Sequence, residues 1–263
     1  MKPYWAIFTA RFRLLLQYRA AALAGLGTQL FFGAILVAVM RAFYRESDAV
    51  QPMNIAEVVT YIWLGQAFLA LLPWRGDPEI VDLVRNGGVA YELLRPMHLY
   101  RLWFARAVAM RTAPTLLRAT PLVLIAGLFL DLSLPASGTA LLWWAVALTG
   151  AVALSAAITV LLNFSLLWTI SGEGITQLMP FLVMFLSGMI LPLPLFPEWA
   201  QTTLHWLPFR GLMDVPHRIY LGNLAGMEAM LALVQQWSWV VVLALAGHVL
   251  LARGLKRLVV QGG

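Results

Sequence analysis

The stretch "AAALAGLGTQLFFGAILVAVM", residues 20–40, carries no charged side chain. A helix crosses the roughly 30 Å hydrocarbon layer of a bilayer in about 20 residues, because each residue advances the helix by about 1.5 Å. The stretch is long enough to cross, and it is too long for the apolar region of a cleavable signal peptide. It therefore predicts a membrane-spanning helix.

The composition of the whole chain agrees with a membrane protein. Of its 263 residues, 61% are hydrophobic and 11% are charged, and the mean hydropathy is +0.80. A soluble domain carries about 25% charged residues, so a soluble fold of this length could not bury so much apolar surface. The net charge is +6, but the cations lie between apolar segments, which predicts contact with membrane lipid and no nucleic-acid partner. The chain has no cysteine, which excludes disulfides and thiolate metal sites.

Further apolar segments follow the first one. We predict an all-α integral membrane fold, a single transmembrane domain over residues 1–263 with six spans. The spans are 20–40, 58–74, 113–130, 139–170, 175–191 and 231–252. The segment 139–170 is long for one helix but short for two with a turn.

The positions of Lys and Arg predict the orientation of the chain. Cytoplasmic segments carry an excess of these residues. With the N-terminus inside, the inner segments hold four cations before Ala20, seven from Arg75 to Arg118 and three after Ala252, against four outside. Splitting 139–170 into two spans would place the last three outside. The pattern thus predicts both termini in the cytoplasm.

The first residues have a helical pattern of their own. In "PYWAIFTARFRLLLQY", residues 3–18, aromatic and leucine side chains recur at helical spacing, with arginines largely between them. This pattern is typical of an amphipathic helix that lies in the inner membrane interface. A positively charged flank that only orients the first span is the alternative.

A short polar helix is predicted inside, between spans two and three, by "GDPEIVDLVRNGG", residues 76–88. Asp77 is a suitable N-cap and Pro78 suits the first helical position. Gly87 and Gly88 supply a helix stop. Such a short helix needs a surface to lie on. That surface is either a soluble partner, which would apply force to it, or the chain's own loops.

Two longer stretches resemble a known family. One is "RNGGVAYELLRPMHLYRLWFAR", residues 85–106, and the other is "LSGMILPLPLFPEWAQTTLHWLPFRGLMDVPHRIYLG", residues 186–222. Together with the order of helices, they resemble the permease subunits of type-2 ABC exporters over nearly the whole chain. The resemblance implies that residues 77–86 are the coupling helix, which would contact a separate ATP-binding subunit through Asp77, Pro78, Glu79, Ile80, Asp82, Leu83, Val84 and Arg85.

The resemblance also implies partners and cargo. This chain has no phosphate-binding G-x-x-x-x-G-K-[ST] motif. Two copies of an ATP-binding ABC ATPase subunit would therefore bind ATP and Mg²⁺. The chain itself is expected to bind no cofactor and to be a transport subunit, not an enzyme. A second permease, identical or homologous, would complete the translocation route in the bacterial inner membrane. The cargo would be an amphipathic drug, a lipid or a lipid-like molecule.

The same resemblance implies that spans two and five line the translocation route. The candidate route residues in these spans are Gln66, Gln177 and Pro180. Either glutamine could instead bond a neighbouring helix. Short re-entrant helices after span five would form an outer gate with Pro197, Trp199 and Trp206.

Arg118 lies inside span three. It would extend to the lipid headgroups or pair with Glu173.

Two other functional classes compete with the exporter. An intramembrane enzyme is disfavoured because the sequence has no H-E-x-x-H or G-x-S-x-G motif and no paired aspartates at lipid depth. An ion-coupled secondary carrier or channel without an ATPase is the alternative to the exporter. Such proteins usually show internal repeats or charged residues at the membrane midplane, and neither is evident here.

Overall fold

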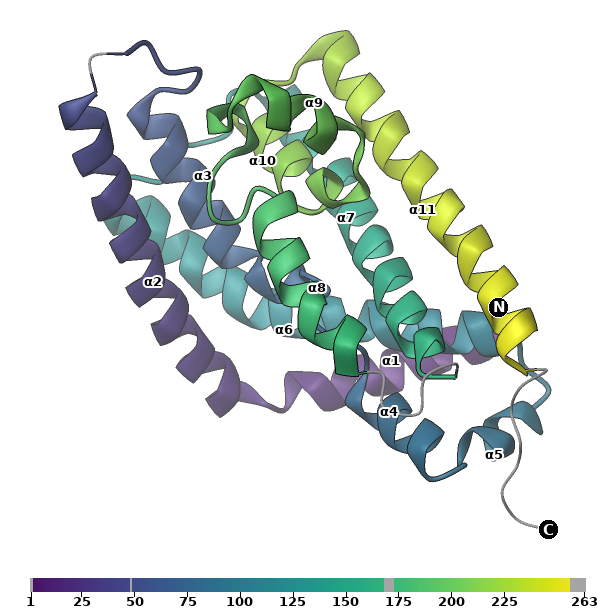
Figure 1. The fold of residues 1–263 in the computed structure, drawn as a ribbon. Helices are drawn as coiled ribbons and strands as arrows, with labels where there is room; N and C mark the ends of the chain where they lie inside the picture. The colour runs from purple at the N-terminus through teal and green to yellow at the C-terminus, as the bar shows by residue number, and fades with distance from the viewer. Residues whose placement is uncertain (1, 48, 168–172, 256–263) are drawn as a thin grey trace.

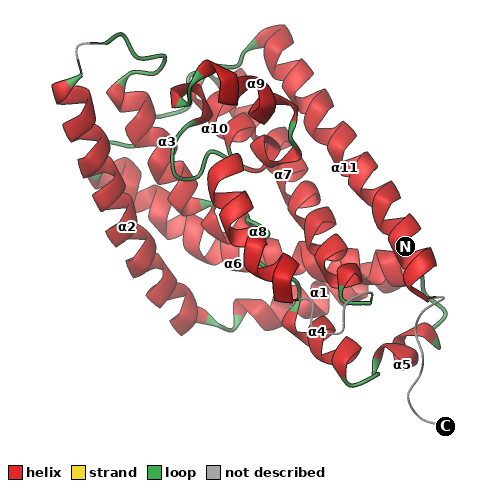
Figure 2. Ribbon diagram, viewed as in Figure 1, coloured by secondary structure: helices red, strands yellow, loops and turns green. Residues whose placement is uncertain are grey.

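The computed structural model describes residues 2–47, 49–167 and 173–255, and all regular structure in them is helical (Figure 2). This confirms the all-α prediction. The elements are α1 (Lys2–Leu16), α2 (Arg19–Glu46), α3 (Ile55–Ala67), η1 (Leu69–Leu71), α4 (Pro78–Arg85), α5 (Val89–Leu93), α6 (Leu99–Phe129), α7 (Gly138–Ser165), α8 (Glu173–Leu186), η2 (Leu193–Leu195), α9 (Glu198–Trp206), η3 (Pro208–Leu212), α10 (Asp214–Leu221) and α11 (Gly226–Leu255).

Four of the described helices are long and apolar enough to cross a membrane: α2, α6, α7 and α11. They correspond to four of the six predicted spans. The segment 139–170 forms one helix, α7, as far as Ser165, and residues 168–170 lie outside the described part of the chain. The N-terminal helix is also present, as α1.

The other two predicted spans contain shorter helices. In the segment 58–74, α3 ends at Ala67 and one 3-10 turn follows, while the segment 175–191 holds α8, which ends at Leu186. At about 1.5 Å per residue, α3 and α8 are each roughly 20 Å long, which is less than the hydrocarbon layer. A six-span layout remains a prediction.

The helix of the third predicted span begins earlier than expected. It was predicted over 113–130, but α6 begins at Leu99 and continues through Pro114 and Pro121. Arginines interrupt the apolar pattern in its first half, yet Arg106 and Arg111 bind carboxylates and carbonyl groups of the chain itself. The arginines therefore limit the apolar segment that the sequence shows, but they do not limit the helix, which begins before them at Leu99.

The short helices lie at two opposite ends of the bundle (Figure 1). At one end α1 lies along the first half of α6, with α4 and α5 nearby, and at the other end α9 and α10 lie over α7 and α8. In between, α7 packs against α6, α10 and α11. Small residues permit this close packing: a Cβ on Gly150 of α7 would lie 2.4 Å from the side-chain oxygen of Gln236 on α11.

Candidate functional site

The helix predicted over 77–86 is α4, and its ends follow from local sequence. The Asp77 carboxylate accepts a hydrogen bond from the amide of Glu79 at 3.0 Å, and Pro78 occupies the first turn. At the other end Gly87 has a φ of +74°, a conformation that favours glycine. Capping thus fixes where α4 begins and ends, although eight residues have little helical stability alone.

The apolar side of α4 faces its own chain. Ile80 is fully buried in a cluster with Val89 of α5 and Leu99 and Trp103 of α6. Leu83 and Val84 are half-buried against the same cluster. The apolar stripe therefore attaches α4 to α5 and α6 of the same chain, and a role of these residues in contacting a partner stays a prediction.

Two carboxylates of α4 are held by arginines from two other helices. Asp77 is buried, and its oxygens lie 3.5 Å from Arg11 of α1 and 3.4 Å from Arg106 of α6. Glu79 binds the same two guanidinium groups, that of Arg106 at 2.7 Å. Because charge-assisted bonds of this kind are the strong ones, α1, α4 and α6 are joined at one point.

Arg106 also reaches α5. One of its nitrogens lies 3.5 Å from the buried carboxylate of Glu92, which accepts a hydrogen bond of 2.6 Å from the indole N–H of Trp103. Along α1 and α6, the hydroxyl of Tyr4 accepts a bond from the amide of His98. Tyr4 bonds the residue just before α6, and Arg11, further along α1, shares the Asp77 carboxylate with Arg106, further along α6. The two helices therefore run side by side in the same direction.

The segment before α4 is fixed to α6 and α7 by buried polar groups. Arg111 of α6 donates to the carbonyl oxygens of Leu72 and Arg75, at 2.8 and 2.9 Å, and to the Thr159 hydroxyl of α7 at 2.8 Å. The side-chain oxygen of Asn163, also on α7, accepts a bond of 2.9 Å from the Asp77 amide. Asn163 lies 86 residues along the chain from the amide that it binds, so no local pattern in the sequence indicates this contact.

The electrostatic field of the arginines acts on Glu79. Burial raises the pKa of its carboxyl group, but hydrogen bonds and charge from Arg11, with Arg106, outweigh this and lower the pKa below its usual value of 4.5. Glu79 is therefore ionised at neutral pH, which keeps its bonds to both arginines intact.

The outward side of this end is formed by polar and apolar side chains together. Pro78, Asp82 and Arg85 of α4 are exposed. Tyr91 of α5 and Leu94 just after it expose 75% and 81% of their surface. Among the described residues, no three His, Asp or Glu side chains come together in a way that could hold a metal ion. This surface is suited to contact with a protein.

The residues proposed for a route lie apart from this site. The Gln66 side chain is buried, and its Cγ would lie 3.1 Å from a Cβ on Gly33 of α2. Gln177 of α8 is exposed and Pro180 is half-buried. Gln66 thus packs inside the chain, whereas Gln177 faces outwards, and their role in a route stays a prediction.

The other end contains the residues proposed for an outer gate. Pro197 precedes α9, and Trp199 and Trp206 of α9 are both exposed. The indole of Trp239 donates to the carbonyl oxygen of Trp206 at 3.0 Å, which attaches the end of α9 to α11. Neither re-entry into the membrane nor gating is tested by this arrangement.

The proposed pair of Arg118 and Glu173 cannot be placed, because the Glu173 side chain lies outside the described residues. The guanidinium of Arg118 packs on α2, where a Cβ on Gly25 would approach it to 2.6 Å. Gly25 therefore gives Arg118 its space beside α2.

Comparison with known proteins identifies the family. No curated protein and no solved structure matches the chain. Residues 30–262 match the model of a family described as "ABC-2 family transporter protein". This match covers every helix from within α2 to α11, including α4, α5 and their partners on α6 and α7. The chain therefore belongs to the ABC-2 family of membrane transporter proteins.

Proposed function

We propose that the chain is the permease subunit of an ATP-driven exporter, which works with two copies of an ABC ATPase and with a second permease, identical or homologous. The family match and the apolar helices support a multi-pass permease. ATP and Mg²⁺ would bind the ATPase. In this proposal α3 and α8 complete six spans, both termini are cytoplasmic, and the membrane is the bacterial inner membrane.

One observation carries the proposal: α4 is bonded to α1, α6 and α7 and exposes its opposite side. Arg11 and Arg106 hold its first turn, and Asn163 holds the amide of Asp77. A force on the exposed side of α4 would be transmitted through these contacts to α6 and α7, because a connected network of hydrogen bonds and ion pairs resists deformation. The closing of two ATPase subunits would supply such a force.

The α4 residues then divide into two groups. Asp77, Glu79 and Ile80, with Leu83 and Val84, transmit movement, since their side chains are bound to the chain itself. The ATPase would contact the exposed residues of this end, which are Pro78, Asp82 and Arg85 of α4 and Tyr91 and Leu94 beyond it. Reversing the charge of Asp77 would disrupt the fold, so the clean test of contact is Asp82.

The experiment is copurification of a coexpressed, untagged ABC ATPase with the tagged chain in mild detergent. The double variant Asp82→Lys, Leu94→Ser should lose the ATPase while the permease still folds. Leu134→Ser is the matched control, because Leu134 is 86% exposed on the loop between α6 and α7. A wild-type chain that transports in vesicles without any ATPase would favour the ion-coupled carrier instead.

The route and the cargo follow from the same proposal. Gln66, Gln177 and Pro180 would line the route at the contact of two permeases, and Pro197, Trp199 and Trp206 would close its outer end. The apolar spans suit an amphipathic drug, a lipid or a lipid-like molecule. ATP-dependent movement of a fluorescent lipid across proteoliposomes, reduced by Gln66→Leu, is the measurement that tests this.

A further inference from the structure

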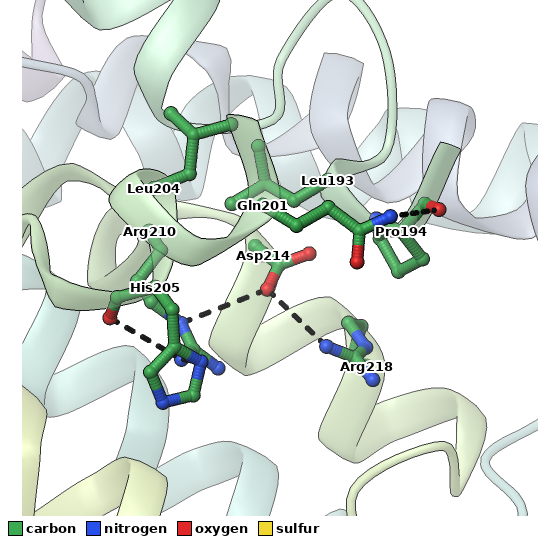
Figure 3. A pocket seen from close by; sticks show the side chains of 8 residues that line it. All are labelled: Leu193, Pro194, Gln201, Leu204, His205, Arg210, Asp214 and Arg218. Carbon is green, nitrogen blue, oxygen red and sulfur yellow. Dashed lines mark hydrogen bonds and ion pairs between the residues drawn. The ribbon is translucent and has the colours of Figure 1, made fainter. Parts of the chain in front are cut away.

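A polar pocket lies at the end of the bundle opposite α4, between η2, α9, η3 and α10. It has a volume of about 110 Å³, and Arg210, Asp214 and Arg218 converge on it beside Gln201 and His205 (Figure 3). One water needs only about 10–15 Å³ by this kind of measure, so the pocket has room for a small polar group. It is separate from the α4 site, and the inference drawn from it does not depend on the proposed transport function.

The charges around this pocket do not balance. Two guanidinium groups face one carboxylate, which leaves a formal charge of +1. Asp214 Oδ2 lies 3.9 Å from Arg210 Nε and 3.8 Å from Arg218 Nη1. Charge-assisted hydrogen bonds between such groups are about 2.7–2.9 Å long, so the carboxylate is too distant to bond these two nitrogens.

The remaining contacts of Arg210 are with neutral groups. Its Nη1 lies 2.5 Å from Nδ1 of His205, and 3.5 Å from both the His205 carbonyl oxygen and the Gln235 side-chain oxygen. The Arg210 side chain is only 5% exposed, so surface water solvates its charge poorly. The nearest anion to this buried guanidinium is Asp214, 3.9 Å from its Nε, so the close pairing that buried charges normally have is incomplete here.

Several polar atoms of the cluster are buried without a hydrogen-bond partner. Within the described part of the chain these are Nε of Arg210, Nε of Arg218 and Oδ1 of Asp214. Nε atoms without a partner also occur in Arg11, Arg111 and Arg118, but here two of them and a carboxylate oxygen belong to residues around one pocket, where a bound ion or water would satisfy them. Donors from two arginines at one small pocket point to an anion as the missing partner.

We propose that this pocket binds a monoanionic oxygen group, of the phosphodiester or carboxylate type, through Arg210 and Arg218. A single negative charge neutralises the cluster. The planar guanidinium fork matches the paired oxygens of such a group. Asp214 limits the affinity, because it already cancels one of the two positive charges, and it disfavours dianions.

Two sources can supply this chemistry: the headgroup of an anionic lipid or a dissolved anion. Trp199 and Trp206 are exposed on α9, the helix that lines the pocket through Gln201, Leu204 and His205, and tryptophan is enriched at membrane interfaces, where headgroups are found. Arg218 lies at the rim with its side chain 24% exposed, so a headgroup could reach it from outside.

The test uses the full chain purified in detergent, with thermal unfolding followed by tryptophan fluorescence. The additions are phosphatidylglycerol, a lipid with one phosphodiester charge, phosphatidylcholine, and sodium phosphate against sodium chloride of equal ionic strength. We expect phosphatidylglycerol or phosphate to raise the midpoint of the wild-type chain. A shift with the lipid alone identifies a headgroup, and a shift with phosphate alone identifies a dissolved anion.

Variants separate this pocket from other basic surfaces. Arg218→Gln should raise the half-maximal concentration of the anion at least about tenfold, the effect of losing one charge-assisted bond. Arg41→Gln is the control, since Arg41 pairs with Asp131 at 2.7 Å outside the pocket and should leave the value unchanged. Asp214→Asn raises the cluster to +2, so the anion should bind this variant more tightly and shift its midpoint further than that of the wild type.

Three results would overturn the proposal. The first is a wild-type midpoint that neither phosphatidylglycerol nor phosphate raises, in which case the pocket holds only water. The second is equal weakening by Arg218→Gln and Arg41→Gln, which indicates unspecific attraction. The third is an Asp214→Asn variant that responds to the anion less than the wild type, and this readout remains available if Arg218→Gln does not fold.

Discussion

Replacing Arg106 by glutamine removes the guanidinium that joins α6 to α4 and α5. Its contact with Glu79 is short, at 2.7 Å, but the Glu79 side chain is 55% exposed, so this pair contributes only about 0.2–1 kcal/mol. The contacts with Asp77 and Glu92 are longer, at 3.4 and 3.5 Å, but both carboxylates are buried.

Removing one partner of a buried pair costs about 3–5 kcal/mol when the other charge is left alone. Here Asp77 keeps Arg11, and Glu92 keeps the indole of Trp103, so we expect a smaller cost of about 2–4 kcal/mol. For a chain of this size, 1 kcal/mol corresponds to about 2–4 °C, so the unfolding midpoint should fall by roughly 5–15 °C.

The assay is thermal unfolding of the purified chain in detergent at pH 7, followed by tryptophan fluorescence. Arg101→Gln is the control, because Arg101 is exposed on the same helix, and its midpoint should stay within about 2 °C of the wild type. Glu92→Gln should lower the midpoint more than Glu79→Gln, since Glu92 is the buried partner. An Arg106→Gln midpoint equal to that of Arg101→Gln would refute the reasoning.

Three further predictions concern the same end of the molecule. Gly76→Ala would place a Cβ 2.5 Å from the side-chain oxygen of Asn163 and should destabilise the chain by about 1–3 kcal/mol. Gly27→Ala is the control, because a Cβ there has no atom within 4 Å, and it should be neutral or slightly stabilising. Equal unfolding midpoints for the two variants would contradict this. Asn163→Ala leaves the buried amide of Asp77 without its acceptor and should lower the stability by about 1–3 kcal/mol. In a double-mutant cycle, Asn163→Ala combined with Gly76→Ala should lower it by less than the sum of the two single effects. Because the pKa of Glu79 is lowered in the folded chain, its contribution to stability is present above the ordinary glutamate pKa of 4.5 and is lost as the pH falls below it. Unfolding midpoints measured over a pH series should therefore fall less in acid for Glu79→Gln than for the wild type. Identical pH profiles of the two chains would exclude the effect.

The sequence predicted features that depend on local residues. The bounds of α4 follow from Asp77, Pro78 and the Gly87 stop, and the four long helices follow from apolar length. These signals lie within one element, so they can be read without knowing what that element packs against.

The sequence did not predict how α4 is attached. Arg106 and Arg111 were counted only as cytoplasmic cations, although both lie in the continuous helix α6, and Asn163 lies 86 residues from the amide it binds. The apolar stripe of α4 left two alternatives open, and Ile80 is buried against the chain itself. The direction of an amphipathic face shows that a surface is needed, but it does not identify which surface.

The pocket at the other end also depended on tertiary structure. His217 is fully buried, with its ring 5.1 Å from that of Tyr61, and no local pattern in the sequence indicates this burial. Asp214 and Arg218 are spaced four residues apart, which places them on one side of α10, and Arg210 lies four residues before Asp214 in the turn η3. That spacing was a usable signal, but the mismatch in charge and distance became visible only in the structure.

Site-specific cross-linking tests the central claim most directly, because the chain has no native cysteine. Asp82→Cys on α4 and Thr202→Cys on α9, both exposed and at opposite ends, are labelled with a photoactivatable maleimide in complexes with the coexpressed ATPase. We predict an ATPase adduct at Asp82→Cys and none at Thr202→Cys. An adduct at Thr202→Cys alone, or none at Asp82→Cys while the ATPase copurifies, would contradict the account.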